Sequence, residues 1–202
     1  MREKILEKAA DMFLNLGFKS VTMDDIANEM GISKKTIYVH FENKTQLVKQ
    51  VTFFMFNLIS HGIDCICDLK KNPIDELYEV KSFLLYHLKD EKSSPHYQLQ
   101  KYYPKIYDTL KLKQFEVMSD CIKDNLNRGI EQGLYRKEID VDYIIKLYFN
   151  GMMGLKNPEL FEPTKYSMNY LMEGYLEYHV RAIATEKGIQ SLNQILQNQH
   201  EA

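Results

Sequence analysis

The apolar residues at the start of the chain recur every three or four positions, which is the spacing of one face of an α-helix. The first such stripe consists of Ile5, Ala9, Met12, Phe13 and Leu16. Gly17 follows it directly and is a typical helix stop. Thr22 and Asp25 then form a Thr-x-x-Asp pattern, in which the hydroxyl can accept a hydrogen bond from an unpaired amide of the next helix. Ser33 and Asn43 are suited to cap two more helices, so four helix starts are predicted within the first 45 residues.

Longer helical patterns follow, and they begin at or near Lys44, Pro73, Lys111, Asp140 and Thr164. The stretch that begins near Lys111 is expected to end before Gly133. The last stretch is expected to run unbroken to Glu186, before Gly188. Runs of alternating apolar and polar residues, which would indicate β-strands, are essentially missing. The pattern therefore predicts an all-α protein with short helices first and longer helices after them.

Residues 23–42 have the features of a helix-turn-helix. Two helices that cross closely need a small residue at the crossing, and Ala27 supplies it four positions before Gly31, which suits the turn because glycine adopts a positive φ easily. A small core would be closed by Ile26, Met30, Ile32, Ile37 and Phe41. The other face of the following helix presents Lys34, Lys35, Thr36, Tyr38 and His40. Residues at the start of such a helix reach base edges in a major groove, while hydroxyl and ammonium groups hold phosphates.

The charge of this segment supports a nucleic-acid partner. Residues 33–50 contain four lysines against one glutamate, whereas the whole chain has a net charge of -2. Lys44 lies at the first turn of the next helix, where backbone amides and the helix dipole also favour a phosphate. A solvated helix surface is the ordinary explanation for a face of this composition. Its coincidence with Ala27, Gly31 and Ser33 favours DNA binding instead.

The first 48 residues or so resemble the DNA-binding domain of the TetR (tetracycline repressor) family. The resemblance rests on Thr22, Ile26, Ala27, Gly31, Ile32, Ser33, Thr36, Ile37, Tyr38, His40, Phe41, Lys44 and Leu47, preceded by Ile5, Ala9, Phe13 and Gly17. The rest of the chain matches the family only in length and helical layout. The resemblance implies an all-α homodimeric transcription regulator. Residues 1–46 would form a three-helix helix-turn-helix DNA-binding domain, and residues 47–202 a larger helical bundle for ligand binding and dimerisation.

By the same comparison, seven residues would lie on or near DNA: Thr22, Lys34, Lys35, Thr36, Tyr38, His40 and Lys44. The first three residues of the recognition helix, from Lys34, would read bases, while Tyr38 and Lys44 would hold the DNA backbone. Two points stay open: Lys35 stands where many family members have a small residue, so it either reads guanine or holds the helix further out. His40 could equally be a packing residue next to Phe41. The N-terminal basic arm of some relatives is reduced to two basic residues here, so we do not expect minor-groove readout.

The remainder of the chain is rich in Tyr, Phe and Met, which form adaptable walls for apolar ligands. Aromatic stripes in helices more often only pack, so these residues are candidates rather than a defined pocket. The candidates for an effector site are Phe54, Leu58, His61, Tyr86, Tyr102, Tyr103, Tyr107 and Tyr148. Several hydroxyl groups and one imidazole among apolar surfaces suit a mainly hydrophobic small molecule rather than a polyanion.

The last long helices contain glycines, each of which weakens a helix by up to about 1 kcal/mol relative to alanine. They therefore suggest the close approach of another helix, and in the TetR family the corresponding helices form the dimer interface. The candidates are Leu147, Gly151, Gly154, Leu155, Tyr170, Leu171, Gly174, Tyr175 and Tyr178. The alternative is that the glycines kink the helices or fit the protomer's own core. A dimer would bind a palindromic operator, and an effector would favour a conformer with the wrong separation of the two DNA-binding heads.

Composition excludes several other classes. The longest apolar stretch, residues 52–59, is too short to span a membrane. The three cysteines are odd in number and lack the spacing of a disulfide framework, so we expect a cytoplasmic protein whose thiols fill the core. His61, Cys65 and Cys121 would supply at most three metal ligands without a clustered spacing, so no metal site is predicted. No motif for catalysis or for cofactor binding is present.

Two other functions stay open from the sequence. One is an enzyme or carrier in which the helical bundle binds an apolar molecule and the N-terminal helices only cap it. The other is an interaction module whose helix-turn-helix binds protein. Catalytic turnover would favour the first, and a steeply salt-dependent affinity for duplex DNA would exclude the second.

Overall fold

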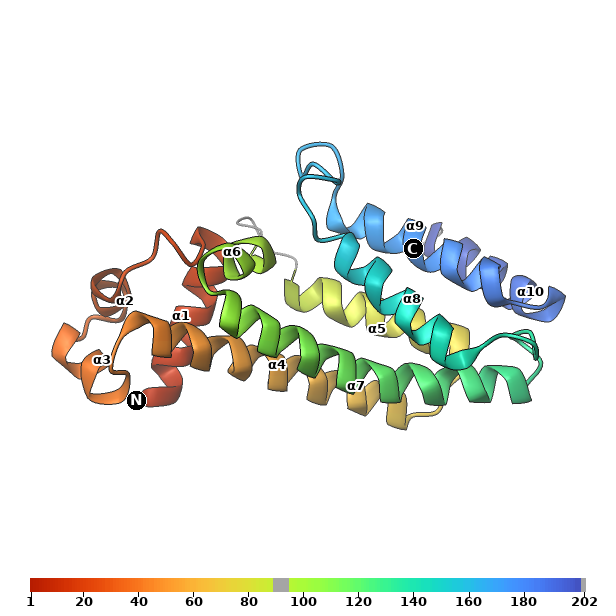
Figure 1. Ribbon diagram of the computed structural model, residues 1–202, viewed down its shortest axis with the longest axis horizontal. Coiled ribbons are helices and arrows are strands. Elements are labelled where there is room, and N and C mark those ends of the chain that lie inside the picture. Colours follow the sequence, from red (N-terminus) through yellow and green to blue (C-terminus); the bar gives the residue numbers. More distant parts are fainter. Residues whose placement is uncertain (89–94, 201–202) are drawn as a thin grey trace. The chain divides into compact units, whose positions relative to one another are not determined.

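The computed structural model describes residues 1–88 and 95–200, and these are almost entirely helical (Figure 1). Their helices are α1 (Arg2–Leu16), α2 (Met23–Met30), α3 (Lys34–His40), α4 (Lys44–Asp68), α5 (Pro73–Leu88), α6 (Pro95–Tyr102), α7 (Pro104–Glu131), α8 (Val141–Gly154), α9 (Met168–Ile183) and α10 (Glu186–His200). Within the described ranges, β-pairing is limited to an isolated antiparallel bridge between Tyr135 and Ala184. The predicted all-α class is therefore confirmed. In this part of the chain no helix is both long and apolar enough to cross a membrane.

The predicted helix starts and stops near the N-terminus are confirmed in detail. The Thr22 hydroxyl accepts a hydrogen bond from the amide of Asp25 at 3.1 Å, and the Asp25 carboxylate accepts one from the amide of Thr22 at 2.8 Å. This is a complete capping box. Ser33 caps α3 through the amide of Thr36 at 3.1 Å, and Asn43 caps α4 through the amide of Gln46 at 2.9 Å. These caps are local interactions, which explains why the sequence pattern located them.

The chain divides into two compact units, residues 1–60 with 87–114 and residues 61–86 with 115–202. The first unit contains the helix-turn-helix and has its own apolar core. The core includes the fully buried residues Ile5, Phe13, Ile26, Ile37, Phe41, Leu47 and Val48. Ala27 is also buried, as expected for the residue at the crossing of α2 and α3. The predicted domain boundary between residues 46 and 47 stays a prediction.

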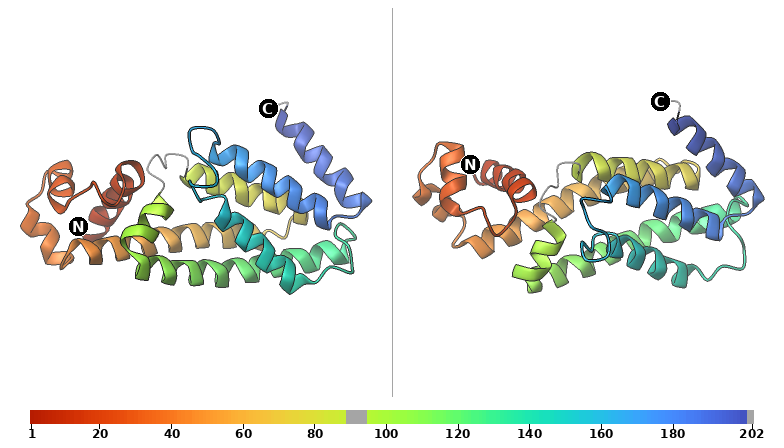
Figure 2. Two further views of the ribbon diagram at one scale, coloured as in Figure 1. Left: turned by 45° about the horizontal axis from the view of Figure 1, so that its top comes forward. Right: turned by 90° about the horizontal axis from the view of Figure 1, so that it is seen from above.

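The second unit contains most of α5, all of α8 and α9, and α10, together with the adjoining parts of α4 and α7. Within it, α9 packs against α8 and α10 (Figure 2). Its core includes Ile74, Leu126, Tyr135, Val180, Ile183 and Leu192. A buried polar network crosses this core, because Arg128 binds the Glu76 carboxylate at 2.6 Å and Asn125 donates to the same carboxylate at 2.8 Å. The hydroxyl of Tyr135 donates to Asn125 at 3.1 Å and extends the network.

Two helix boundaries differ from the prediction. The expected helix from Thr164 to Glu186 is two helices, α9 and α10, and Gly188 lies inside α10. The chain leaves the helical path at Ala184, where the amide of Thr185 donates to the carbonyl of Leu134 at 2.9 Å. Leu134 is 51 residues away from Thr185 in sequence, so the residues around Thr185 give no sign of this contact. The helix expected near Lys111 begins earlier, at Pro104, a residue that suits the first position of a helix because its missing amide is not needed there.

The expectation that the three thiols fill the core was wrong, because two of them form a disulfide and the third is exposed. Cys67 in α4 and Cys121 in α7 form a disulfide across a sequence separation of 54, with their Cα atoms 6.6 Å apart. The cause is the packing of the end of α4 against α7, which the spacing of cysteines along the chain does not reveal. Cys65 is a free, exposed thiol, and its sulfur lies 3.9 Å from Nε2 of His61. Cys121, which the sequence grouped with His61 and Cys65 as a weak set of metal ligands, is thus bonded to Cys67 instead.

Candidate DNA-binding surface and effector site

The recognition helix α3 is held in place by the turn before it and by a buried residue within it. Gly31 ends α2 in the left-handed region with a φ of 63°, and its turn is closed by a hydrogen bond from the amide of Ile32 to the carbonyl of Ala27 at 3.0 Å. Ile37 is fully buried and fixes α3 to the core of the first unit. The opposite side of α3 is therefore presented to solvent in a defined orientation, as binding in a DNA groove requires.

Lys34 is ion-paired in the structure. Its ammonium group lies 2.8 Å from a carboxylate oxygen of Asp24 in α2 and 6.0 Å from the centre of the Tyr38 ring. The hydrogen bond to Asp24 raises the pKa of Lys34. The side chain is thus fully charged at neutral pH, but it must leave Asp24 to reach DNA.

The other predicted residues of α3 differ in how available they are. Lys35 and Tyr38 are exposed, and Tyr38 keeps 43% of its surface accessible. The hydroxyl of Thr36 is 2.9 Å from that of Ser33, so it is partly engaged in the cap of α3. His40 is half-buried and its ring contacts Phe41 edge-on, with the ring centres 6.4 Å apart. This contact is compatible with both of the roles predicted for His40.

Thr22 and Lys44 flank α3 but make internal contacts. The Thr22 hydroxyl caps α2 and also donates to Asp25 at 2.8 Å. Lys44 donates to the backbone carbonyl of Lys19 at 3.2 Å, and burial lowers its pKa, an effect that the charge of Asp25 opposes. Both side chains must exchange these partners if they bind phosphate.

Two features of this surface were missed by the sequence reasoning. Val39 is 72% exposed on α3, and an apolar side chain at this place can contact a thymine methyl group. Its exposure could have been recognised from its place between Tyr38 and His40 on a helix whose buried residue is Ile37. Arg2 bonds to Gln50 and lies over the ring of Phe41 at 5.7 Å. Arg2 is thus held against the first unit, and the absence of minor-groove readout stays a prediction.

The eight predicted effector residues fall into different environments. Phe54, Tyr103 and Tyr107 are half-buried and pack against the same core cluster of the first unit. Burial raises the pKa of both tyrosines, so their hydroxyls remain protonated at neutral pH. Four candidates are exposed, namely Leu58, His61, Tyr86 and Tyr102, and Tyr148 is buried in the core of the second unit. Three of the eight thus border one apolar core, and the other five do not.

A buried polar cluster in the second unit also escaped the sequence reasoning. Lys81 is buried, binds Glu173 across α5 and α9, and lies 5.0 Å from the centre of the Tyr78 ring. The Tyr78 hydroxyl and one carboxylate oxygen of Glu173 are buried without a hydrogen-bond partner. Burial and the charge of Glu173 raise the pKa of Tyr78. Nothing in the pattern of α5 distinguishes Lys81 from an ordinary surface lysine.

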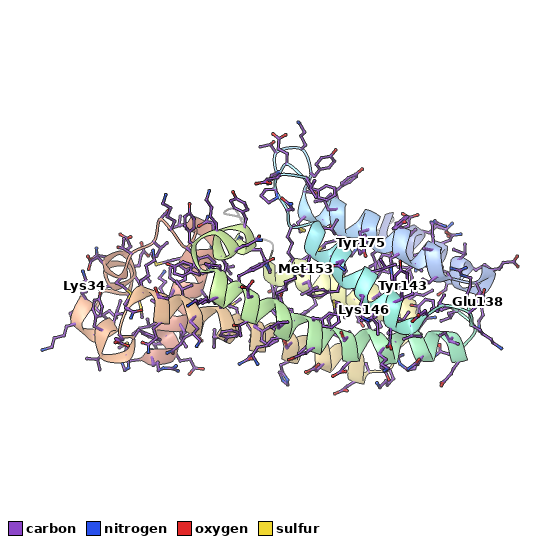
Figure 3. The ribbon with its side chains drawn as sticks, in the orientation of Figure 1. Lys34, Glu138, Tyr143, Lys146, Met153 and Tyr175 are labelled. Carbon is purple, nitrogen blue, oxygen red and sulfur yellow. A yellow bond between two sulfur atoms is a disulfide. The ribbon has the colours of Figure 1, made fainter. Side chains whose placement is uncertain are left out.

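The predicted dimer residues separate into two groups. Leu155, Leu171 and Tyr175 pack within the second unit, and a Cβ at Gly151 would lie 2.1 Å from the Tyr175 ring. Gly151 therefore fits the protomer's own core, which was one of the two readings of the glycines. The outward group consists of Leu147, Gly154, Tyr170, Gly174 and Tyr178. Figure 3 shows Tyr143 and Lys146 along α8, and Tyr143 is exposed as well.

Known proteins resemble this chain both in the sequence of the helix-turn-helix and in the overall helical fold. Residues 5–51 match the family described as bacterial regulatory proteins, tetR family. The chain is 27% identical over 154 residues to the HTH-type transcriptional repressor KstR2 of Mycolicibacterium smegmatis, which covers 72% of each chain. The fold is similar to SmeT, the repressor of the Stenotrophomonas maltophilia multidrug efflux pump SmeDEF, with a TM-score of 0.69 and 18% identity over 92% of this chain and 91% of SmeT. A complex of SmeT with triclosan is similar with a TM-score of 0.66 and 14% identity, covering 92% of both chains.

Proposed function

Because the chain belongs to the TetR family of transcriptional regulators, we propose that it is a homodimeric repressor, released from a palindromic operator by a small, mainly apolar effector. The observation that carries this proposal is the exposed face of α3, on which Lys34, Lys35 and Tyr38 are presented from a rigid base. Membership in a family of regulators removes the support for a helical-bundle enzyme.

In the proposed complex, the first turn of α3 enters the major groove. Lys34 and Lys35 are suited to guanine O6 and N7, and Thr36 and Val39 lie where they can contact neighbouring bases. Tyr38 and Lys44 would bind backbone phosphates, and Lys44 gains from the amides at the start of α4. The helix is short, so its position depends on the turn at Gly31 and on Ser33.

Dimerisation is proposed to use the outward face of α8 and α9. Tyr170 and Tyr178 are 66% and 71% exposed and, together with Gly174, follow one face of α9 at a spacing of four residues. Aromatic side chains in this number are unusual on a solvated helix and are enriched at interfaces. A two-fold dimer would present two copies of α3 to successive turns of one DNA face.

The effector is proposed to bind at the aromatic cluster of Phe54, Tyr103 and Tyr107. These residues offer apolar surface and two protonated hydroxyls, and they border a core to which α4 contributes Leu47, Val48 and Val51. The similarity of the fold to the complex of SmeT with triclosan supports a small effector of this kind. α4 begins at Lys44 and ends at Asp68, so a ligand that shifts it would act on the DNA-binding head. A swing from 99% bound to 99% released needs a preference of about 5.5 kcal/mol for one conformer.

The first test is selection of binding sites from a pool of random duplex DNA, repeated with Tyr38→Ala and Lys44→Ala. Lys111→Ala, which removes an exposed lysine of α7, is the matched control. We expect a palindrome from the wild type and the control and a loss of enrichment from both variants. Weak binding without a preferred sequence, equal in all four proteins, would contradict the proposal. The recovered palindrome then serves to screen apolar compounds for release.

A further inference from the structure

The disulfide joins the last turn of α4 to α7, next to the loop between α4 and α5. Cys67 is in the last turn of α4 and is buried, whereas Cys121 in α7 is half-buried. A bacterial transcription regulator works on DNA in the cytosol, where disulfides are transient and usually catalytic or redox-sensing. A pair of cysteines that is close enough to bond, in a protein of this class, therefore points to a reversible bond rather than to a permanent cross-link.

The loop between α4 and α5 stays attached to α7 when the disulfide is reduced. Lys70 binds Asp124 of α7 at 2.9 Å, and Arg128 of α7 donates to the backbone carbonyl of Lys71 at 2.8 Å. Neither bond involves a sulfur atom. Reduction would thus loosen the last turn of α4 without detaching the loop that follows it.

The surroundings also suit the reduced thiols. A carboxylate oxygen of Glu76 and the two sulfurs lie within 4.8 Å of one another. A carboxylate has about four lone-pair positions, and that of Glu76 accepts three hydrogen bonds, one from Asn125 and two from Arg128. One position is left for an S–H donor. Because Arg128 also balances the charge of Glu76, the cluster does not need a cation to be stable.

We propose that Cys67 and Cys121 are a peroxide-sensitive switch, which changes operator affinity by joining the end of α4 to α7. The switch rests on the proposed DNA-binding function. α4 links the disulfide to the DNA-binding surface, since it begins at Lys44 beside the helix-turn-helix and ends one residue after Cys67. Fixing one end of this helix restricts the conformers that its other end can adopt.

The chemistry balances with one peroxide per pair of thiols. The thiolate of Cys121, the less buried of the two, attacks a peroxide oxygen, the O–O bond breaks, and hydroxide leaves, which yields a sulfenic acid. The thiolate of Cys67 then attacks this sulfur, the S–O bond breaks, and a second hydroxide leaves as the S–S bond forms. The two thiol protons neutralise the two hydroxides. Overall, two thiols are oxidised and hydrogen peroxide is reduced to two water molecules, and a dithiol reverses the change.

The test compares the full-length protein after treatment with hydrogen peroxide and after dithiothreitol. Peptide mapping without reduction should show a Cys67–Cys121 linkage only in the oxidised sample. Closing a loop across a separation of 54 residues should raise the melting temperature of the oxidised protein by roughly 10 °C. The affinity for the selected operator should differ between the two states by about tenfold, a typical allosteric coupling.

Cys121→Ser should abolish all three differences and melt at the temperature of the reduced wild type, whereas Cys65→Ser, the matched control two residues from Cys67, should retain them. Absence of the linkage after peroxide would overturn the proposal, as would equal operator affinity of the two states. Stoichiometric binding of Zn²⁺ by the reduced protein, lost in Cys121→Ser, would also overturn it in favour of a metal site. Failure of both states to bind any operator would contradict the proposed function instead, and the peptide map and melting curves would still decide whether the bond forms.

Discussion

The ammonium group of Lys34 lies 2.8 Å from the carboxylate of Asp24, so the first residue of the recognition helix is ion-paired with the first turn of α2. Both side chains are about half exposed. The ion pair fixes the position of Lys34 in the free protein, but it also neutralises the positive charge that the proposed DNA complex needs. DNA binding must therefore exchange a carboxylate for a base edge or a phosphate.

Asp24→Asn is expected to increase the affinity for operator DNA at low salt by roughly two- to fivefold, the range for one exposed charge pair. The change removes the competitor of Lys34 and a negative charge that repels DNA. Fluorescence anisotropy across a range of salt concentrations measures the effect. Glu29→Gln is the matched control, because Glu29 also lies on α2 but pairs with Lys8. An equal gain in both variants would show that general charge, and not release of Lys34, is responsible.

Gly31→Ala is expected to lower the free energy of unfolding by about 1 kcal/mol or slightly more, because a left-handed backbone is costly for a residue with a Cβ. Within the described ranges, no atom beyond the two adjacent residues lies within 4 Å of the position that the new Cβ would take, so the loss comes from the backbone alone. Gly31→Asn should lose less, since asparagine tolerates this conformation. Urea denaturation gives both values, and equal stability of the three proteins would contradict the explanation.

Arg128→Met is expected to lower the free energy of unfolding by about 3 to 5 kcal/mol, because it leaves the buried carboxylate of Glu76 without its positively charged partner. The double change with Glu76→Leu should recover much of this loss, since two apolar side chains leave no uncompensated charge. Arg181→Met is the control, because its ion pair with Glu177 is exposed. That control should change stability by less than about 1 kcal/mol. Comparable losses in Arg128→Met and Arg181→Met would count against a special role of burial.

His179 is expected to make the protein less stable as the pH falls below about 6.5. Burial lowers its pKa to about 4, so between these values the unfolded chain takes up a proton that the folded protein does not. Stability is therefore fully present above the unfolded pKa and is lost progressively toward pH 4, by at most about 3 kcal/mol from this group. His179→Phe should flatten this part of the curve, which urea unfolding at several pH values measures. Parallel curves for the two proteins would contradict the prediction.

Gly174→Ala is expected to stabilise the protomer but weaken the proposed dimer. Alanine raises helix stability by up to about 1 kcal/mol, and among the described residues no atom beyond the adjacent residues and the backbone of α9 lies within 4 Å of the new Cβ. A second copy packed closely on this face would meet it. Sedimentation equilibrium measures the dissociation, with Tyr178→Ala as a second interface variant and Tyr86→Ala as an equally exposed tyrosine of α5. Unchanged association in both interface variants would place the dimer interface elsewhere.

The sequence by itself determined the helix-turn-helix. Thr22, Gly31 and Ser33 act on residues within five positions of themselves, through caps and a turn whose geometry is local. The buried positions of α1 and α3 likewise follow from the helical period, because each helix has one face toward the core. These features need no information about distant parts of the chain, and the structure confirms them.

Only the tertiary structure decided which distant residues meet. Lys34 pairs with Asp24 across a turn, Cys67 bonds to a residue 54 positions away, and Lys81 binds Glu173 across a separation of 92. The break between α9 and α10 has the same origin, since it depends on the carbonyl of Leu134. A lysine or a cysteine has the same helical period whether it faces solvent, a carboxylate or another sulfur. Its partner is set by how whole helices pack, and that packing is not encoded in any short stretch of sequence.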